Sequence, residues 1–348
     1  MEYKIDRVYC MSSFLTFRYI VDESKVFDKR YPHKNLELVP NKDKMICDTP
    51  EEIDKAIKIQ LEKVDLSNAG ILLSGGMDSA ILASYMPKGT KAYTAKCDAP
   101  NAVDETERAK RYCEINDLEH VIVDVGWDDY QNSMDGLMLA DGCPVFANEP
   151  QVNCIVKKMK KDGVNVIIYG DNADMVFGGM DKLLSKDWKY DEWIKRYTFV
   201  DPCKVLFDFE SMDDVYSEYK VGNDKIDFIR FLNIIFAGSS SVAYVNSFHY
   251  NKIEYLDPYA VMKMSKPYDL DRIRSGESKY LIRQLFRMKY PNLEVPEKIA
   301  MARAADYWLK DWQGPIRPEF RKGCIEGMTG EQKFLIYSLE RFLNLLDE

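Results

Sequence analysis

The sequence predicts an α/β fold, in which a parallel sheet carries helices on both faces and a largely helical C-terminal region follows. Short apolar runs rich in β-branched residues alternate with helical patterns between residues 69 and 169. A glycine-rich turn directly follows the first of these runs, as in many ligand-binding parallel sheets. After about residue 180 the strand pattern fades, and long helical patterns with aromatic residues replace it.

The chain has 348 residues, 46% hydrophobic and 30% charged, which is typical of a globular protein with a sizeable core. We divide it into an N-terminal arm (1–50), an α/β core (51–180) and a mainly helical part (181–348). The net charge of -9 and the lack of a long Lys/Arg run argue against nucleic-acid binding. The eight cysteines form no C-x-x-C pair, which disfavours a zinc site and favours reduced thiols in the cytoplasm.

The predicted elements follow in order. Residues 1–50 resemble an extended lead-in, and Thr49 caps a helix whose apolar positions have helical spacing. We expect strands at 69–73, 91–95, 119–125 and 164–169, and helices at 80–86, 104–115, about 150–161 and 228–236. No apolar run reaches the roughly 18–20 residues that span a bilayer, so we expect no membrane partner.

The segment Ser74–Ser79 (SGGMDS) lies between a predicted strand and a predicted helix. Gly75 and Gly76 permit a tight turn close to a ligand, and the helix N-terminus favours pyrophosphate. Ser74 and Ser79 add hydroxyl donors, Leu72 would line the adenine side, and Asp78 suits a Mg²⁺ ion that bridges phosphates. The alternative is a tight turn with an Asp cap. The spacing is not that of the P-loop.

The SGGMDS segment resembles the PP-loop of the ATP pyrophosphatases, whose fold is of the adenine nucleotide α-hydrolase type. The resemblance implies that ATP is cleaved between its α and β phosphates, which gives an adenylated substrate and pyrophosphate.

Residues 169–180 (YGDNADMVFGGM) resemble the asparagine synthetase segment G-E-G-[SA]-D-E-[LV]-F-G-G-Y. The resemblance implies that Gly170 belongs to the nucleotide site and that Asp174 is the second Mg²⁺ ligand. Asp171 stands where the family has the Glu that handles the nucleophile's proton. Asn172 replaces a Gly and Met175 replaces an acid. The alternative is a Gly-rich turn whose acids only solvate it.

Two lysines near the C-terminus continue this resemblance. The segment 278–283 (SKYLIR) matches the family's K-x-x-[LI]-R and contains Lys279, and Lys298 lies where the family has a catalytic lysine. The resemblance implies that Lys298 stabilises charge in the transition state. Pro296 replaces the Arg that usually precedes this lysine by two residues. The alternative for both lysines is an ordinary solvated position.

The family's glutamine-dependent members begin with a glutaminase domain, and only about 70 residues precede the Ser74–Ser79 loop here. Residues 14–19 (FLTFRY) resemble the linker that follows this domain, so we expect a free-standing synthetase half. Nitrogen would come from free ammonia, from a separate glutaminase subunit or from an amine on the substrate. The departures at Asp171, Asn172 and Met175 indicate a substrate other than aspartate, such as a specialised or sugar carboxylate.

The resemblance therefore implies an amide-forming ligase that uses ATP and Mg²⁺ on a small-molecule carboxylate, and that could form homo-oligomers. Two alternatives stay open: a PP-loop enzyme that modifies a nucleotide or base, and a degenerate synthetase that binds ATP and regulates a partner. Intact Asp78 and Asp174 argue against the second alternative.

Overall fold

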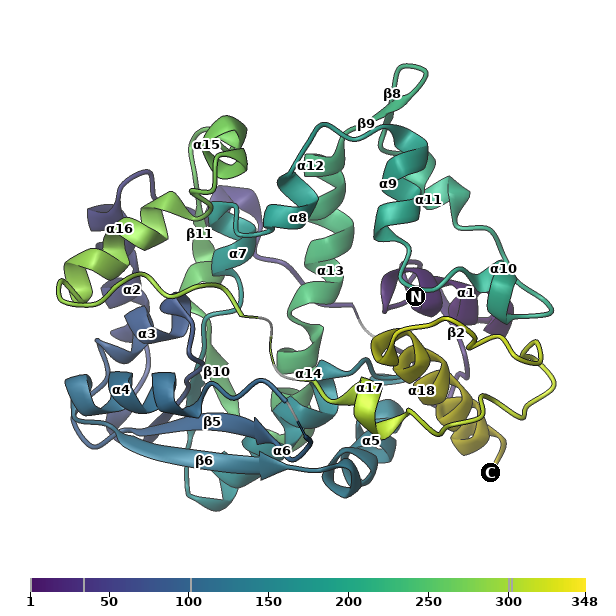
Figure 1. Cartoon of the computed structure of the whole chain (residues 1–348), viewed down its shortest axis with the longest axis horizontal. Coiled ribbons are helices and arrows are strands. Elements are labelled where there is room, and N and C mark those ends of the chain that lie inside the picture. The colour runs from purple at the N-terminus through teal and green to yellow at the C-terminus, as the bar shows by residue number, and fades with distance from the viewer. Residues whose placement is uncertain (1, 34, 101, 300, 302) are drawn as a thin grey trace.

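The computed structural model describes residues 2–33, 35–100, 102–299, 301 and 303–348. Its centre is a five-stranded sheet with the strand order β10-β7-β4-β5-β6, and every neighbouring pair is parallel (Figure 1). The strands are β4 (Ala69–Leu72), β5 (Lys91–Cys97), β6 (Glu119–Val125), β7 (Val166–Ile168) and β10 (Glu254–Leu256). The predicted parallel α/β architecture is therefore confirmed.

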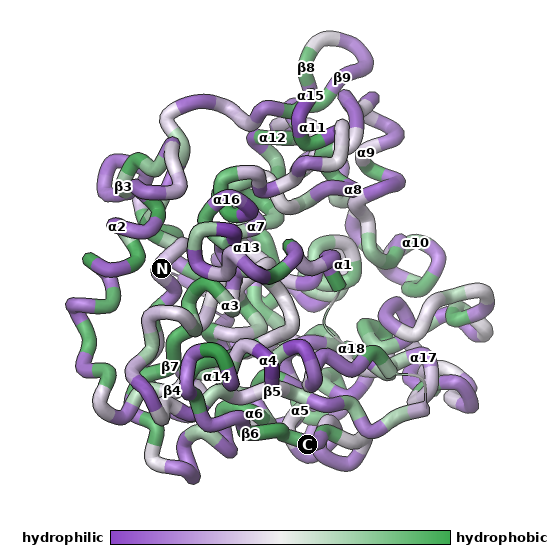
Figure 2. Tube along the Cα trace, turned by 60° about the vertical axis from the view of Figure 1, so that its left-hand side comes forward, coloured by the Kyte–Doolittle hydropathy of each residue, from purple (hydrophilic) through white to green (hydrophobic). Residues whose placement is uncertain are grey.

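Helices cover both faces of this sheet. One group packs together from α2 (Pro50–Leu61), α3 (Met77–Ala83), α4 (Thr106–Asn116) and α16 (Tyr280–Lys289). The other group contains α5 (Trp127–Asp141), α6 (Asn148–Lys161) and α14 (Val242–Asn251). Successive residues of a strand point to opposite faces of the sheet and therefore pack against different helix groups. Ile168 belongs to the hydrophobic cluster with α2 and α3, whereas Ile167 and Tyr169 belong to the cluster with α6 and α14. Figure 2 shows hydrophobic residues concentrated inside the trace.

The helix boundaries around the sheet agree with the sequence only in part. A capping box joins Thr49 and Glu52 at the start of α2, as the sequence predicts. Helix α3 begins at Met77, three residues earlier than we expected, and ends at Ala83. The Ser74–Ser79 segment therefore includes the first helical turn. Helix α5 was not predicted from the sequence.

The fifth strand comes from the C-terminal part of the chain. Glu254 to Leu256 pair in register with Val166 to Ile168 of β7. We expected strand structure to end near residue 180, but three residues are too few to give a readable alternation pattern. Strand β10 brings Asp257, which follows it directly, to the same edge of the sheet as the end of β7.

Residues 1–50 are not uniformly extended as predicted. Helix α1 spans Arg7–Phe17, and every residue from Tyr9 to Phe17 is buried. Its small polar side chains are satisfied by backbone carbonyls, as Thr16 donates to the Ser12 carbonyl and Ser13 to that of Tyr19, so burial on all sides is tolerated. The helix ends at Arg18, whose φ of 68° is left-handed. The three-part division of the chain stays a prediction.

The remaining elements include the helical half on the right of Figure 1, whereas α7, α15 and β11 lie toward its upper left. The helices are α7 (Ala173–Phe177), α8 (Asp181–Leu184), α9 (Tyr190–Tyr197), α10 (Pro202–Val205), α11 (Asp213–Ser217), α12 (Phe228–Phe231), α13 (Ala237–Ser240), α15 (Leu270–Arg274), α17 (Ala305–Trp308) and α18 (Gly330–Asp347). Short strands complete the set: β1 (Lys4–Ile5), β2 (Lys25–Val26), β3 (Met45–Ile46), β8 (Lys220–Val221), β9 (Lys225–Ile226) and β11 (Met262–Lys263).

A nearly continuous helix, 228–251, runs between the two halves. It consists of α12, a π-helical turn (Leu232–Phe236), α13 and α14. Among the described residues it is the one helix with the length and apolar composition of a membrane span. Phe231 and Phe248 are fully buried, and α14 packs against α6, so the helix belongs to the core of the protein.

Candidate active site

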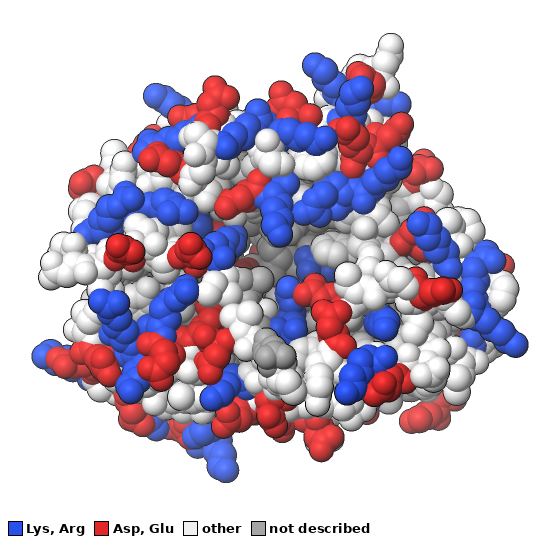
Figure 3. Space-filling model, in the orientation of Figure 1, with Lys and Arg blue, Asp and Glu red and all other residues white. Residues whose placement is uncertain are grey.

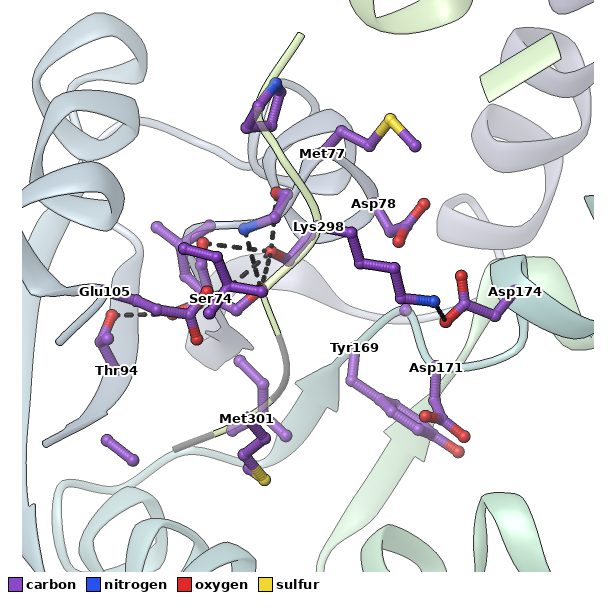
Figure 4. A pocket seen from close by; sticks show the side chains of 18 of the residues that line it. Ser74, Met77, Asp78, Thr94, Glu105, Tyr169, Asp171, Asp174, Lys298 and Met301 are labelled. Atoms are coloured by element: carbon purple, nitrogen blue, oxygen red, sulfur yellow. Dashed lines mark hydrogen bonds and ion pairs between the residues drawn. The ribbon is translucent and has the colours of Figure 1, made fainter. Parts of the chain in front are cut away.

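A cleft lies at the C-terminal ends of β4, β5 and β7, and both halves of the chain contribute to its walls (Figure 4). Nearly all residues predicted for the site line it: Leu72, Ser74, Gly76, Asp78, Ser79, Gly170, Asp171, Asp174, Lys279 and Lys298. Gly75 lies beside the cleft, between its two neighbours in the loop. The structure therefore brings together residues that are more than 200 positions apart in the chain, because Lys279 pairs with Asp78 across 201 residues.

The two serines hold the Ser74–Ser79 loop in shape. The backbone N–H of Ser74 donates to Ser79 Oγ at 3.1 Å, and the two hydroxyl oxygens lie 3.0 Å apart. The N–H of Gly76 donates to Ser74 Oγ at 3.1 Å. These contacts pre-form the turn before α3, whose N-terminus faces the cleft.

Glu105 contacts the same loop and was not predicted as a site residue. Its Oε1 accepts the N–H of Gly75 at 3.2 Å, and burial raises the pKa of its carboxyl group. A Cβ at Gly75 would lie 3.1 Å from this oxygen and from Arg108 Cβ, so the glycine permits a close approach of the two segments. It lies in an acid-rich segment, 103–109, next to the start of α4.

Four charged side chains, Asp78, Asp174, Lys279 and Lys298, form what we call the acid–lysine cluster. Lys279 Nζ lies 2.5 Å from Asp78 Oδ2 and 2.6 Å from Asp174 Oδ1. Lys298 Nζ lies 2.7 Å from Asp174 Oδ2 and 2.7 Å from the carbonyl oxygen of Gly179. Figure 4 shows Lys298 reaching across the cleft to Asp174, with Asp78 facing the same space.

The pKa values of the cluster's two carboxylates are shifted in opposite directions. Burial raises the pKa of Asp78 above its ordinary value, and Lys279 only partly offsets this. Burial acts in the same direction on Asp174, but Lys279 and Lys298 together outweigh it and hold its pKa below the ordinary value. Asp78 Oδ1 is buried without a hydrogen-bond partner among the described residues, so it can accept a further cation or donor.

Lys279 is a buried lysine with an unusual backbone. Its side chain reaches the cluster from the residue that precedes α16, where φ is 50° and ψ is 41°. It is 3% exposed, and Asp78 and Asp174 raise its pKa although burial opposes this. A non-glycine residue in the left-handed region costs about 1–3 kcal/mol and is enriched at functional sites. The sequence motif predicts the residue but not this conformation.

Two glycines of the 170–179 segment are required by close contacts. A Cβ at Gly179 would lie 2.0 Å from Asp174 Oδ1 and 2.7 Å from Lys279 Cδ. A Cβ at Gly170 would lie 2.9 Å from both Leu82 Cδ1 and Tyr259 Cε2. Gly179 therefore leaves room for the acid–lysine cluster, and Gly170 leaves room for packing beneath the cleft.

Asp171 lies beside the cluster in a network that the fifth strand completes. Ser241 Oγ donates to Asp171 Oδ2 at 2.7 Å. Asp257 Oδ2 accepts the backbone N–H groups of Asp171, at 3.1 Å, and of Asn172, at 2.9 Å. The Asn172 side-chain amide also donates to this oxygen at 2.9 Å. Asp257 thus fixes the backbone under Asp171, and Asn172 joins the network where a glycine could not.

The pKa of Asp171 is raised to about 7. Burial is the main cause; the hydrogen bond from Ser241 opposes it, and Asp257, Asp174 and Asp78 add to it. Burial also raises the pKa of Asp257 to about 6. A carboxylate whose pKa is close to neutral can exchange a proton efficiently at physiological pH.

The sheet side of the cleft is more apolar. Leu72, Val152, Ile155 and Met301 line it, together with Tyr93. This wall has the character expected for a flat aromatic base, whereas the loop and the acid–lysine cluster form the polar wall.

The sheet is parallel, a glycine-rich loop joins β4 to α3, and the helices that follow the neighbouring strands β4 and β7 each carry a carboxylate in the first turn. These features define an α/β synthetase domain of the PP-loop class. The sequence profile of the asparagine synthase family matches residues 49–307, and the chain belongs to this family. Membership implies ATP-dependent amide ligation, as the sequence motifs predict.

A relative from Methanocaldococcus jannaschii is 24% identical over 226 residues. It is provisionally described as glutamine-hydrolysing asparagine synthetase 1. The alignment covers 62% of this chain and 38% of the relative, so the chain spans well under half of that protein's length.

Proposed function

We propose that this protein is an ATP-dependent ligase that adenylates a small-molecule carboxylate and joins it to ammonia or an amine. The observation that carries the proposal is the acid–lysine cluster. Its carboxylates lie in the first turns of α3 and α7, the helices that follow β4 and β7, and its lysines come from the C-terminal half. Such a cluster binds a metal–triphosphate group and stabilises the charge that develops when the phosphate chain breaks.

Asp78 and Asp174 suit Mg²⁺. This ion is usually held by one or two carboxylates together with substrate phosphates. The described residues contain no group of three or more metal-ligating side chains, but they do contain these two carboxylates and the partnerless Asp78 Oδ1. When bound, Mg²⁺ would neutralise phosphate charge. The chain's own contribution is to orient the phosphates by the loop and by Lys279 and Lys298.

The reaction has two steps. A substrate carboxylate oxygen forms a bond to the α-phosphorus of ATP, the bond to the bridging oxygen breaks, and pyrophosphate leaves. The nitrogen nucleophile then attacks the carbonyl carbon, AMP leaves with its electron pair, and the nitrogen loses a proton. Asp171 is the group we assign to accept that proton, because its raised pKa and its place beside the cluster support this role.

Isotope transfer tests the mechanism. The protein is incubated with ATP, Mg²⁺, ammonium or hydroxylamine, and a panel of ¹⁸O-labelled carboxylic acids. We expect AMP and pyrophosphate as products, with one ¹⁸O atom in the AMP. The Asp78→Asn variant is expected to lose both products, whereas Asp208→Asn, at an exposed position, retains them. Formation of ADP and phosphate, or AMP without the label, would overturn the mechanism.

The nitrogen source is tested in the same reaction. Ammonium, glutamine and substrates with an internal amine are compared at equal concentration. We expect ammonium or a substrate amine to support turnover, because the proposed second step needs only a nitrogen nucleophile. A cytoplasmic location and a homo-oligomeric state stay predictions of the sequence.

A further inference from the structure

A second cavity lies in the helical half, next to the cleft. It shares Asp171 and Asp174 with the cleft, so it adjoins the residue to which we assign the proton transfer. Its other walls come from the end of α1, from α9, and from the segments 146–148 and 329–332. Four basic side chains line it: Arg18, Lys195, Arg196 and Arg303. Figure 3 shows Lys and Arg side chains around the hollow between the two halves.

Arg18 is held rigidly in this cavity. Its guanidinium carbon lies 4.0 Å from the centre of the Phe199 ring and 4.7 Å from that of Phe146. No described residue forms an ion pair or a side-chain hydrogen bond with it, and its Nε is buried without a partner. Its backbone adopts a left-handed conformation, with φ at 68°. A buried guanidinium without an anionic partner is costly, because aromatic rings replace its lost hydration only in part.

Arg303 lines the same cavity, and only some of its guanidinium nitrogens have hydrogen-bond partners in the part of the chain that the structure describes. One terminal nitrogen donates to Asn148 Oδ1 at 2.7 Å, and another lies 2.6 Å from Glu331 Oε1. Its Nε is buried without a partner among the described residues. The charge of Arg303 lowers the pKa of Arg18 further, in addition to the effect of burial. Glu331 offsets part of the charge of Arg303, but the two guanidinium groups still repel each other, and an anion bound between them would relieve this repulsion.

We propose that Arg18 and Arg303 bind a second anionic group of the substrate, a carboxylate or a phosphate, remote from the carboxylate that reacts beside Asp171. The inference rests on the proposed function, which it deepens by naming a substrate class. An acid whose remote end is neutral would leave Arg18 buried and without a counter-ion. Guanidinium groups suit this task, since their planar fork binds a carboxylate or phosphate through two hydrogen bonds.

Direct anion binding tests the inference without any turnover. Isothermal titration calorimetry of the full chain, without ATP, uses succinate, inorganic phosphate and neutral succinamide as probes. We expect succinate or phosphate to bind, and the stronger of the two identifies the remote group as carboxylate or phosphate. Succinamide is expected not to bind. Absence of binding by both anions, or equal binding by succinamide, would overturn the inference.

Variants locate the bound anion. Arg18→Gln and Arg303→Gln are each expected to weaken binding about tenfold or more, the loss typical of one charge-assisted contact. Arg18→Lys keeps the charge but loses the fork, so an intermediate loss is expected. If Arg18→Gln does not fold, Arg18→Lys and Arg303→Gln together test the site. Arg111→Gln, at an exposed arginine of α4, is the matched control and retains wild-type binding. Unchanged binding in the Arg18 and Arg303 variants would refute the site.

Failure of this inference and failure of the proposed function are distinguishable. Anion binding is measured without ATP, so a chain that binds succinate but forms no AMP refutes only the ligase mechanism. A chain that forms labelled AMP while Arg18→Gln leaves anion binding and the KM of doubly charged acids unchanged refutes only the substrate class.

Discussion

Replacement of Asp171 by Asn should stabilise the protein at neutral pH. Asp171 is surrounded by Asp257, Asp174 and Asp78, and burial is the main cause of its raised pKa. An Asn is neutral at every pH and still offers an oxygen to the hydroxyl of Ser241, which donates at 2.7 Å. The substitution therefore removes the cost of ionising the side chain but keeps its hydrogen bond.

The magnitude follows from linkage. The pKa of Asp171 is about 7 in the folded protein, against an ordinary value of 3.8. Between these values the unfolded chain releases a proton that the folded protein retains, so the wild type loses stability as pH rises through this window. At about 1.4 kcal/mol per pH unit, the variant should gain about 4 kcal/mol relative to the wild type by pH 8.

Urea unfolding at intervals from pH 4 to pH 8 measures this difference. We expect the advantage of Asp171→Asn over the wild type to increase steadily up to about pH 7 and then to level off. Asp208→Asn, an exposed aspartate, is the control and should show no such increase. An advantage that does not change with pH would refute the raised pKa of Asp171 and, with it, the basis for its role as proton acceptor.

Three further outcomes follow from the site. Asp78→Asn should lower kcat/KM for pyrophosphate release by at least about 1,000-fold, measured with an enzyme-coupled pyrophosphate assay, while the circular dichroism spectrum stays native. Lys298→Met should lower kcat by about 100-fold or more and Lys298→Arg by less, and an equal loss in both would argue against a charge-stabilising role. Gly179→Ala places a Cβ 2.0 Å from Asp174 Oδ1 and should cost about 1–3 kcal/mol of unfolding free energy. Gly126→Ala, whose Cβ would be 3.6 Å from its nearest neighbour, should cost less than about 1 kcal/mol, and equal losses would contradict the steric argument.

The helices and strands whose own residues carry a recognisable sequence pattern were predictable. Strands β4 and β7 are short apolar runs, and α2 carries a complete capping box, so residue type and spacing are sufficient there. Helix α1 was missed because it is buried almost all round and lacks a polar stripe. Strand β10 was missed because its pairing with β7, rather than its composition, makes it a strand.

The residues of the site fall into the same two groups: those that a local sequence pattern predicts and those that depend on tertiary contacts. Motifs identify Asp78, Asp174, Lys279 and Lys298 because the chemistry restricts those residue types, and the structure brings them within ion-pair distance. Their assigned roles stay predictions. The supporting groups depend on tertiary contacts that no local pattern encodes. Asp257 acts on backbone groups 85 and 86 residues away, and the two rings that enclose Arg18 come from distant segments of the chain.

The contribution of β10 to the sheet has a consequence for how the protein is made. On the ribosome, the SGGMDS turn and the 170–179 segment emerge well before Asp257, whose carboxylate fixes the backbone of Asp171 across 86 residues of chain. Lys279 and Lys298 emerge later still. A nascent chain can therefore assemble most of its sheet while the acid–lysine cluster is incomplete. Most of the sheet can consequently fold before the cleft has all of its charged side chains.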